Sequence, residues 1–130
     1  MEKLFEALVT RYNACAIAGS TNGFWAHPAP EKKARPYVTW LAVSNAPEET
    51  SDSWEERPLI QLSVFSADEE PNEVMQLFAL LKAAFDKARF TVDGMDLVYI
   101  RREAERGPLA DPDGGWMYSG DWRVMVAKAK

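Results

Sequence analysis

The C-terminal segment of the chain carries the pattern that most constrains the fold. From Trp116 to Ala127, polar and charged side chains such as Ser119, Asp121 and Arg123 fall at odd positions. The even positions are Trp116, Tyr118, Gly120, Trp122, Val124 and Val126. Because successive side chains of a strand point to opposite faces, this period of two predicts a long β-strand with one apolar face.

Three other segments predict longer strands, and one predicts a very short strand. Tyr37–Ser44 is rich in aromatic and β-branched residues and is apolar on both faces, so we expect it in the centre of the sheet. Pro58–Ser66 and Leu97–Glu103 alternate instead, and Phe24–Ala26 has room only for a short strand. The positions expected to face the core in the alternating segments are Ile60, Leu62, Val64, Val98 and Ile100.

Two segments have helical periodicity. Residues 2–16 place apolar side chains at the spacing of an amphipathic helix, which the glycines and small polar residues at 19–23 should end. A second helix is expected from Pro71 to Ala88, with acidic residues near its start and basic residues near its end, as the helix dipole favours. Its expected buried stripe is Val74, Leu77, Phe78, Leu81 and Phe85. The segments expected to lack regular structure are 27–36, 45–57, 107–108 and 111–115.

The order of these elements predicts the fold class. Helix, strand, strand, helix, strand and strand follow one another along 130 residues, which suits one domain. Short connections within each pair of strands favour antiparallel pairing. We therefore expect a single α+β domain, with a mostly antiparallel sheet of four to five strands and two helices packed on one face.

Charge and cysteine content exclude some classes of function. The chain has 15 basic and 20 acidic residues, so its net charge is 15 − 20 = −5. An acidic chain is poorly suited to bind nucleic acid, because phosphate binding depends on clustered Lys and Arg. The single cysteine, Cys15, allows no internal disulfide, and we expect it to be a small buried apolar residue. The N-terminus mixes charged and apolar residues and no apolar run is long enough to span a membrane, so a cytosolic protein is expected.

No motif predicts catalysis, a cofactor or a metal. The only histidine, His27, has no evident nucleophile or carboxylate partner. Residues 111–115, Asp-Pro-Asp-Gly-Gly, resemble the start of a calcium loop, but a polar hairpin turn explains them better. We therefore expect no enzyme activity, no catalytic or metal-binding residues and no cofactor.

Tryptophans and acidic residues point instead to protein contacts. Trp40 and Trp122 lie on predicted strands and are expected in the core, whereas Trp25 lies beside prolines and Trp54 lies in a polar segment. Tryptophan is enriched at protein interfaces, and an acidic surface can dock a basic partner or repel DNA. The residues predicted to form an interface are Trp25, Trp54, Glu48, Glu49, Asp52, Glu55 and Glu56.

The order of motifs resembles a known family. A Pro-rich approach leads to Arg35-Pro36-Tyr37-Val38, and the strand over residues 57–66 follows a polar segment. An amphipathic helix ends in Ala84-Phe85, and Phe90-Thr91-Val92-Asp93-Gly94 comes next. The chain closes with the Asp-rich turn and aromatic strand of residues 109–124. Over nearly its whole length it resembles the tail-completion, or tail-terminator, proteins of long-tailed bacteriophages and prophages, although the acidic segment around Trp54 has no match in that pattern.

This resemblance implies a function in virion assembly. It implies that residues 1–130 form one tail-completion domain and that six copies form a ring, which caps the finished tail tube and joins it to the head. The partners would be other copies of the chain, the tail tube and the connector proteins, in the bacterial cytoplasm during assembly and then in the virion tail. It also implies no enzyme activity and no cofactor. DNA would pass through the lumen, and a mildly acidic wall would not hold it.

Two alternatives remain open on the sequence. The chain could be a monomeric acidic module, of the inhibitor or immunity type, whose acidic segment caps a basic site on a partner protein. The less favoured alternative is a small enzyme that uses His27 with a carboxylate from a loop.

Overall fold

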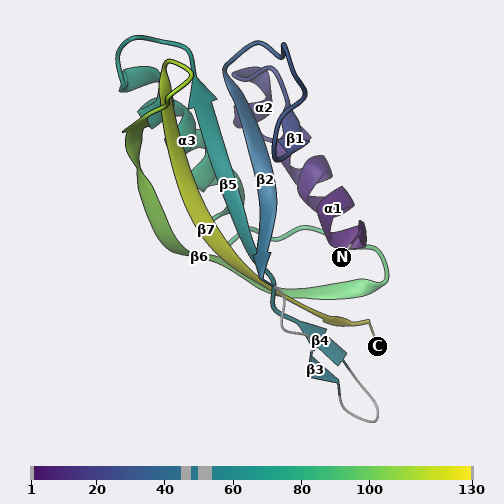
Figure 1. The fold of residues 1–130 in the computed structure, drawn as a ribbon. Helices are drawn as coiled ribbons and strands as arrows, with labels where there is room; N and C mark the ends of the chain where they lie inside the picture. Colours follow the sequence, from purple (N-terminus) through teal and green to yellow (C-terminus); the bar gives the residue numbers. More distant parts are fainter. Residues whose placement is uncertain (1, 45–47, 50–53, 130) are drawn as a thin grey trace.

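The structure is a computed structural model that describes residues 2–44, 48–49 and 54–129, with side chains over 2–43 and 55–129. Three helices and seven strands occur in this part of the chain (Figure 1). The helices are α1 (Glu2–Asn13), α2 (Ala16–Gly19) and α3 (Asn72–Phe85). The strands are β1 (Phe24–Ala26), β2 (Tyr37–Ser44), β3 (Glu48–Glu49), β4 (Trp54–Glu56), β5 (Leu59–Ser66), β6 (Met95–Ala110) and β7 (Trp116–Lys128).

All the described strands form one mixed sheet organised around β7. The pairs β2–β5, β5–β7 and β6–β7 are antiparallel, as expected, and β2 lies inside the sheet between β1 and β5. The α+β class is confirmed, but the sheet holds more strands than the four to five expected. It is mostly antiparallel, as expected, and the exception is β2, which runs parallel to β1 because the Pro-rich segment after β1 carries the chain back.

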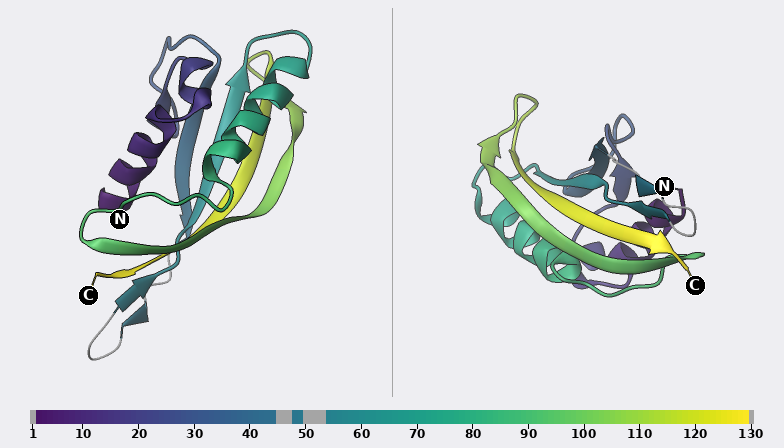
Figure 2. Two further views of the ribbon diagram at one scale, coloured as in Figure 1. Left: turned by 180° about the vertical axis from the view of Figure 1, so that it is seen from behind. Right: turned by 90° about the horizontal axis from the view of Figure 1, so that it is seen from below.

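The helices cover one face of the sheet. Figure 2 shows α1 and α3 side by side on this face, with the long strands β6 and β7 curving around them. The predicted stripe of α3 is buried, and the sheet contributes Val38, Ile60, Leu62, Val64, Trp122, Val124 and Val126 to the same core. Helical structure expected to continue through residue 16 is broken at Cys15, where the backbone is extended and the side chain is only half-buried.

Strand β6 is much longer than the segment expected from the sequence. The predicted strand ended at Glu103 and left Gly107-Pro108 in a loop, but β6 stays paired with β7 through Ala110. Three shifts of register allow this, because a bulge absorbs a residue that cannot join the ladder. One bulge, between Leu97 and Tyr99, turns Val98 outward, so Val98 is 40% exposed where the sequence placed it in the core, and Leu97 packs against the core instead.

The polar connection expected over residues 45–57 contains a small hairpin. Strands β3 and β4 pair in antiparallel fashion, and β4 then joins β7 through Glu55 opposite Ala127 and Glu56 opposite Val126. Figure 1 shows this hairpin extending beyond the end of the main sheet, near the C-terminus. The segment was expected to be irregular because it has no apolar periodicity; the pairing with β7 comes from its place in the fold.

The turn between β6 and β7 is the polar hairpin turn expected at residues 111–115. The N–H of Asp111 donates to the carbonyl of Gly115 at 3.0 Å, and the N–H of Gly114 donates to the carbonyl of Asp111 at 2.9 Å. Arg35 fixes the turn from the neighbouring segment. Its guanidinium pairs with the Asp111 carboxylate and donates to the carbonyl of Gly114 at 2.7 Å.

Candidate assembly surfaces

The β3–β4 hairpin carries most of the acidic residues predicted to form an interface. Its described strands contain Glu48, Glu49, Glu55 and Glu56, while Asp52 lies outside the described residues. Glu48 is opposite Glu55 in the register of these two strands.

An arginine network joins the hairpin to the main sheet. The Arg57 guanidinium lies 3.1 Å from a carboxylate oxygen of Glu55. Arg123 of β7 donates to the Arg57 carbonyl at 2.9 Å and pairs with Glu103 of β6 at 3.2 Å. These contacts hold the base of the hairpin against β7, so its position relative to the sheet is defined.

The two tryptophans of the predicted interface are placed differently. Trp25 is half-buried: its ring makes an edge contact with Tyr37, with 5.7 Å between ring centroids, and the Lys33 ammonium lies 5.5 Å above it. Trp54 opens β4, where its backbone pairs with Glu49. Trp122 is fully buried, as expected, and Trp40 packs against the core through a ring stack on Phe5 at 4.2 Å.

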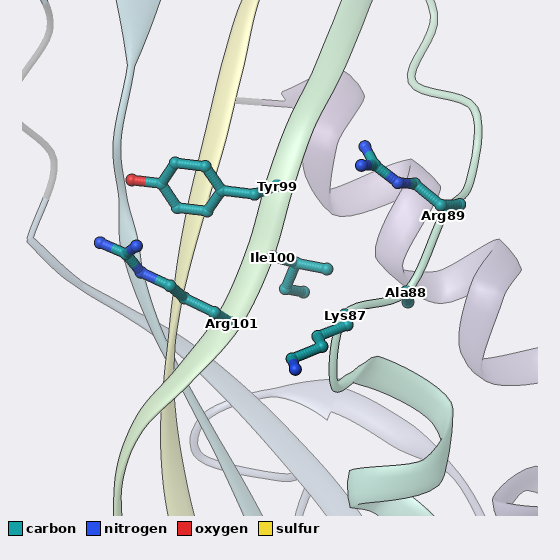
Figure 3. A pocket seen from close by; sticks show the side chains of 6 residues that line it. All are labelled: Lys87, Ala88, Arg89, Tyr99, Ile100 and Arg101. Atoms are coloured by element: carbon teal, nitrogen blue, oxygen red, sulfur yellow. The ribbon is translucent and has the colours of Figure 1, made fainter.

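A cationic cavity lies at the outer edge of β6 (Figure 3). Its volume is about 340 Å³ and its lining is Lys87, Ala88, Arg89, Tyr99, Ile100 and Arg101. Figure 3 shows Tyr99 and Arg101 on one side of the strand and Lys87 and Arg89 on the other. This cluster leaves no contiguous pattern in the sequence, because its two halves belong to different segments that meet only in the folded chain.

Backbone contacts hold the two halves of this cavity together. The N–H of Lys87 donates to the carbonyl of Ile100 at 3.2 Å, and Arg89 donates to the carbonyl of Val98 at 3.0 Å. The Arg101 guanidinium lies 4.6 Å from the centre of the Tyr99 ring. Among the described side chains, none of these three basic residues forms an ion pair, so the cavity presents uncompensated positive charge.

The face of the sheet opposite the helices is partly apolar. Leu41 and Val43 of β2 are 41% and 51% exposed, and Leu109 of β6 is 47% exposed. A smaller cavity of about 170 Å³ on this face contains His27 beside Thr39, Gln61 and Ser63. The lining residues include no carboxylate, so within the described structure His27 lacks the partner that an acid–base site would need.

Metal and membrane sites are also lacking in the described part of the chain. Residues 2–44, 48–49 and 54–129 contain no group of three or more His, Cys, Asp or Glu side chains placed to hold a metal ion. No described helix is long and apolar enough to cross a bilayer.

Few ionisable groups have a shifted pKa, and the shifts have structural causes. Burial raises the pKa of Tyr12, although its hydrogen bond with Thr21 acts in the opposite direction. Burial and the neighbouring Glu105 carboxylate raise the pKa of Tyr118. The hydrogen bond to Asp121 raises the pKa of Arg106. None of these groups belongs to a cluster suited to proton transfer.

Comparison with known proteins identifies the chain at the level of family. The fold resembles that of a chain in the solved structure "Virion of native gene transfer agent (GTA) particle", with a TM-score of 0.83, 15% sequence identity and coverage of 95% of this chain and 94% of that one. A search of curated proteins gives no match. The family model for "Tail completion protein gp17" matches residues 2–126. The chain is thus a structural protein of the phage-tail class. Within that class, it belongs to the tail completion protein gp17 family.

Proposed function

We propose that the protein forms a ring of six copies that caps the finished tail tube and joins it to the head, and that it acts without enzyme activity. Family membership over residues 2–126 is the observation that carries this proposal. The exposed charged and apolar surfaces of the described structure support it. On β2, Leu41 and Val43 expose apolar side chains that a contact with another molecule would cover.

A closed ring requires two different patches on each subunit. In a heterologous interface, one patch of a subunit meets another patch of the next, and rotation closes the ring. We assign Trp25, Trp54 and the acidic residues Glu48, Glu49, Asp52, Glu55 and Glu56 to contacts with other subunits or with tail and connector proteins. The hairpin extends beyond the sheet, which suits a contact with a neighbouring molecule.

The charge of the subunit suits a ring through which DNA passes. A net charge of −5 gives the wall no general attraction for phosphates, so DNA would slide through without being held. The protein would assemble in the cytoplasm of the bacterial host and remain in the virion tail.

Electron microscopy of particles made with and without the gene tests this function. Without the protein, we expect full heads and separate tails; supplying the chain in trans should restore joined particles. Joined, infectious particles formed in its absence would contradict the proposed function.

A further inference from the structure

We infer that Met75 of one subunit inserts into the small cavity beside Leu41 on the next copy in the ring. This cavity, of about 170 Å³, lies on the face of the sheet that the helices leave uncovered. The inference rests on the proposed function, because it requires that copies of the chain meet head to tail. It assigns one patch to each side of that contact.

The cavity has the size and the lining that suit a single apolar side chain. Pockets for small-molecule ligands measure roughly 300–1,000 Å³, and this one is smaller. Its lining combines the short side chains of Thr39 and Ser63 with the longer ones of Leu41, Phe65 and Met117. None of the described residues that line it is Asp, Glu, Lys or Arg. An apolar side chain can therefore enter without taking water away from a charge.

The cavity borders the tryptophan that the sequence predicts at an interface. Trp25 lies opposite Thr39 in the register of β1 and β2, so both side chains point to the same face of the sheet. The Trp25 ring contacts Tyr37, and the Tyr37 ring lies 5.3 Å from that of Phe65, measured between ring centroids. Phe65 lines the cavity, so a subunit that covers the cavity also reaches Trp25.

Met75 is the side chain suited to fill this cavity. Of the exposed large hydrophobic side chains in the described structure, it is the one that belongs to a helix, and it is 49% exposed. Methionine is flexible and polarisable, which suits it to fill irregular gaps at an interface. Its exposed neighbours on α3 are uncharged: Asn72, Gln76 and Ala79. The two patches are therefore complementary in charge, because an apolar sheet face can approach this part of α3 without burying a charge.

Met75 and the cavity lie at opposite sides of the subunit. Lys82 follows Met75 by 82 − 75 = 7 residues, about two turns, so the two share one flank of α3. Lys82 pairs with Glu105 of β6 at 3.7 Å, so this flank is turned toward β6. Strand β6 is at one side of the sheet, whereas the cavity is lined mainly by β2, β5 and His27, the residue after β1. Two different patches at opposite sides are what a head-to-tail contact needs.

Opposite charges introduced at the two patches test this contact. The variants are Met75→Lys, Leu41→Glu and the chain that carries both changes. Matched controls add the same charges elsewhere: Asn13→Lys at the exposed end of α1, and Val98→Glu on β6, where the valine is 40% exposed, close to the 41% of Leu41. Circular dichroism checks that each chain is folded. Every chain is then assayed by native mass spectrometry in solution and by binding to tail tubes that lack the protein.

We expect each single variant to weaken assembly by about ten-fold or more, because a charge would have to leave water for an uncharged patch. The two controls should assemble as the unmodified chain does. The chain with both changes should recover assembly, since each contact then places an introduced ammonium beside an introduced carboxylate.

Other outcomes separate this inference from the proposed function. If the unmodified chain assembles and both single variants assemble equally well, the contact is wrong and the ring stands. The contact is also wrong if both single variants fail and the chain with both changes does not recover. Rings that persist in the single variants but no longer bind tail tubes would assign the cavity to a tail protein instead of a second copy. An unmodified chain that assembles neither in solution nor on tail tubes would overturn the ring and the contact together.

Discussion

Arg35 is a side chain that connects distant parts of the sequence. It is 16% exposed and pairs with Asp111, which is 11% exposed, and its guanidinium lies over the rings of Tyr37 and Phe65 at 5.8 and 5.2 Å. It thereby joins the start of β2 to the turn between β6 and β7. Both features belong to the sequence pattern that resembles the family.

Removing this guanidinium should destabilise the whole domain. We expect Arg35→Ala to lower the free energy of unfolding by about 3 kcal/mol, because it leaves the Asp111 carboxylate largely buried without its partner. Urea unfolding measures the change. Lys33→Ala, in the same loop but exposed, is the control and should change stability little. An equal effect of the two variants would contradict this role of Arg35.

Tyr12 should make stability fall in alkaline solution. Its pKa is raised by burial, so the folded chain holds the phenolic proton more tightly than the unfolded chain does. The contribution of this proton to the free energy of unfolding is complete below the pKa of tyrosine in the unfolded chain, about 10. It is lost as the pH rises through the higher pKa of the folded chain. We expect Tyr12→Phe to reduce this loss, with Thr21 keeping its hydrogen bond to the Ile17 carbonyl at 2.9 Å. Urea unfolding at several alkaline pH values measures it, and an identical decline in both proteins would assign the effect to other groups.

At the scale of elements, the β6–β7 hairpin depends on one glycine. Gly115 has φ of +73°, and a Cβ there would lie 1.8 Å from the Ser66 carbonyl oxygen of the neighbouring strand. Gly114 also has a positive φ, of +100°, but no atom lies within 4 Å of the position that its Cβ would occupy. The two positions share backbone strain and differ in the space available.

This difference gives a matched pair of substitutions. We expect Gly114→Ala to cost about 1 kcal/mol, from backbone conformation alone. Gly115→Ala should cost about 3 kcal/mol, since it adds a steric clash with Ser66. Thermal unfolding of the two variants measures both, and equal losses would show that the turn can shift to make room.

The sequence predicts helices and strands well where one face of the element is buried, because buried positions then recur at regular spacing. The bounds of β2 were predicted to the residue, and the apolar stripe of α3 was correct, because burial on a helix or strand leaves regular spacing. The extension of β6 past Gly107-Pro108 was missed, since bulges and pairing with β7 override local turn preference. Val98 was wrongly predicted to face the core, because the bulge between Leu97 and Tyr99 turns its side chain outward.

The candidate surfaces were predictable to different degrees. The acidic hairpin was identified as an interface candidate because its charges are contiguous in the sequence. The cationic cavity was not, because Lys87 and Arg101 come together only when the segment after α3 hydrogen-bonds to β6. Charges brought together by tertiary structure leave no local pattern to read.

At the scale of the whole molecule, the two half-buried tryptophans Trp25 and Trp40 should behave differently, because only Trp40 packs against the core. We expect Trp25→Ala to reduce binding to tail ends while lowering stability by only about 1 kcal/mol, because this half-buried ring is not packed against the core. Trp40→Ala, which removes a ring stacked on Phe5 against the core, should lower stability by about 3 kcal/mol. Tail-end binding and urea unfolding, compared for the two variants, test this. Unchanged binding by stable Trp25→Ala would exclude Trp25 from the interface.

The most direct test of the account is to count copies of this chain at the head–tail junction. Cryo-electron microscopy of assembled particles, with the chain tagged at its N-terminus, measures both position and copy number. We expect a closed ring of six copies between the tail tube and the head. A particle that joins head to tail without this chain at the junction, or with a single copy there, would contradict the claim that the protein works by assembling through its surfaces.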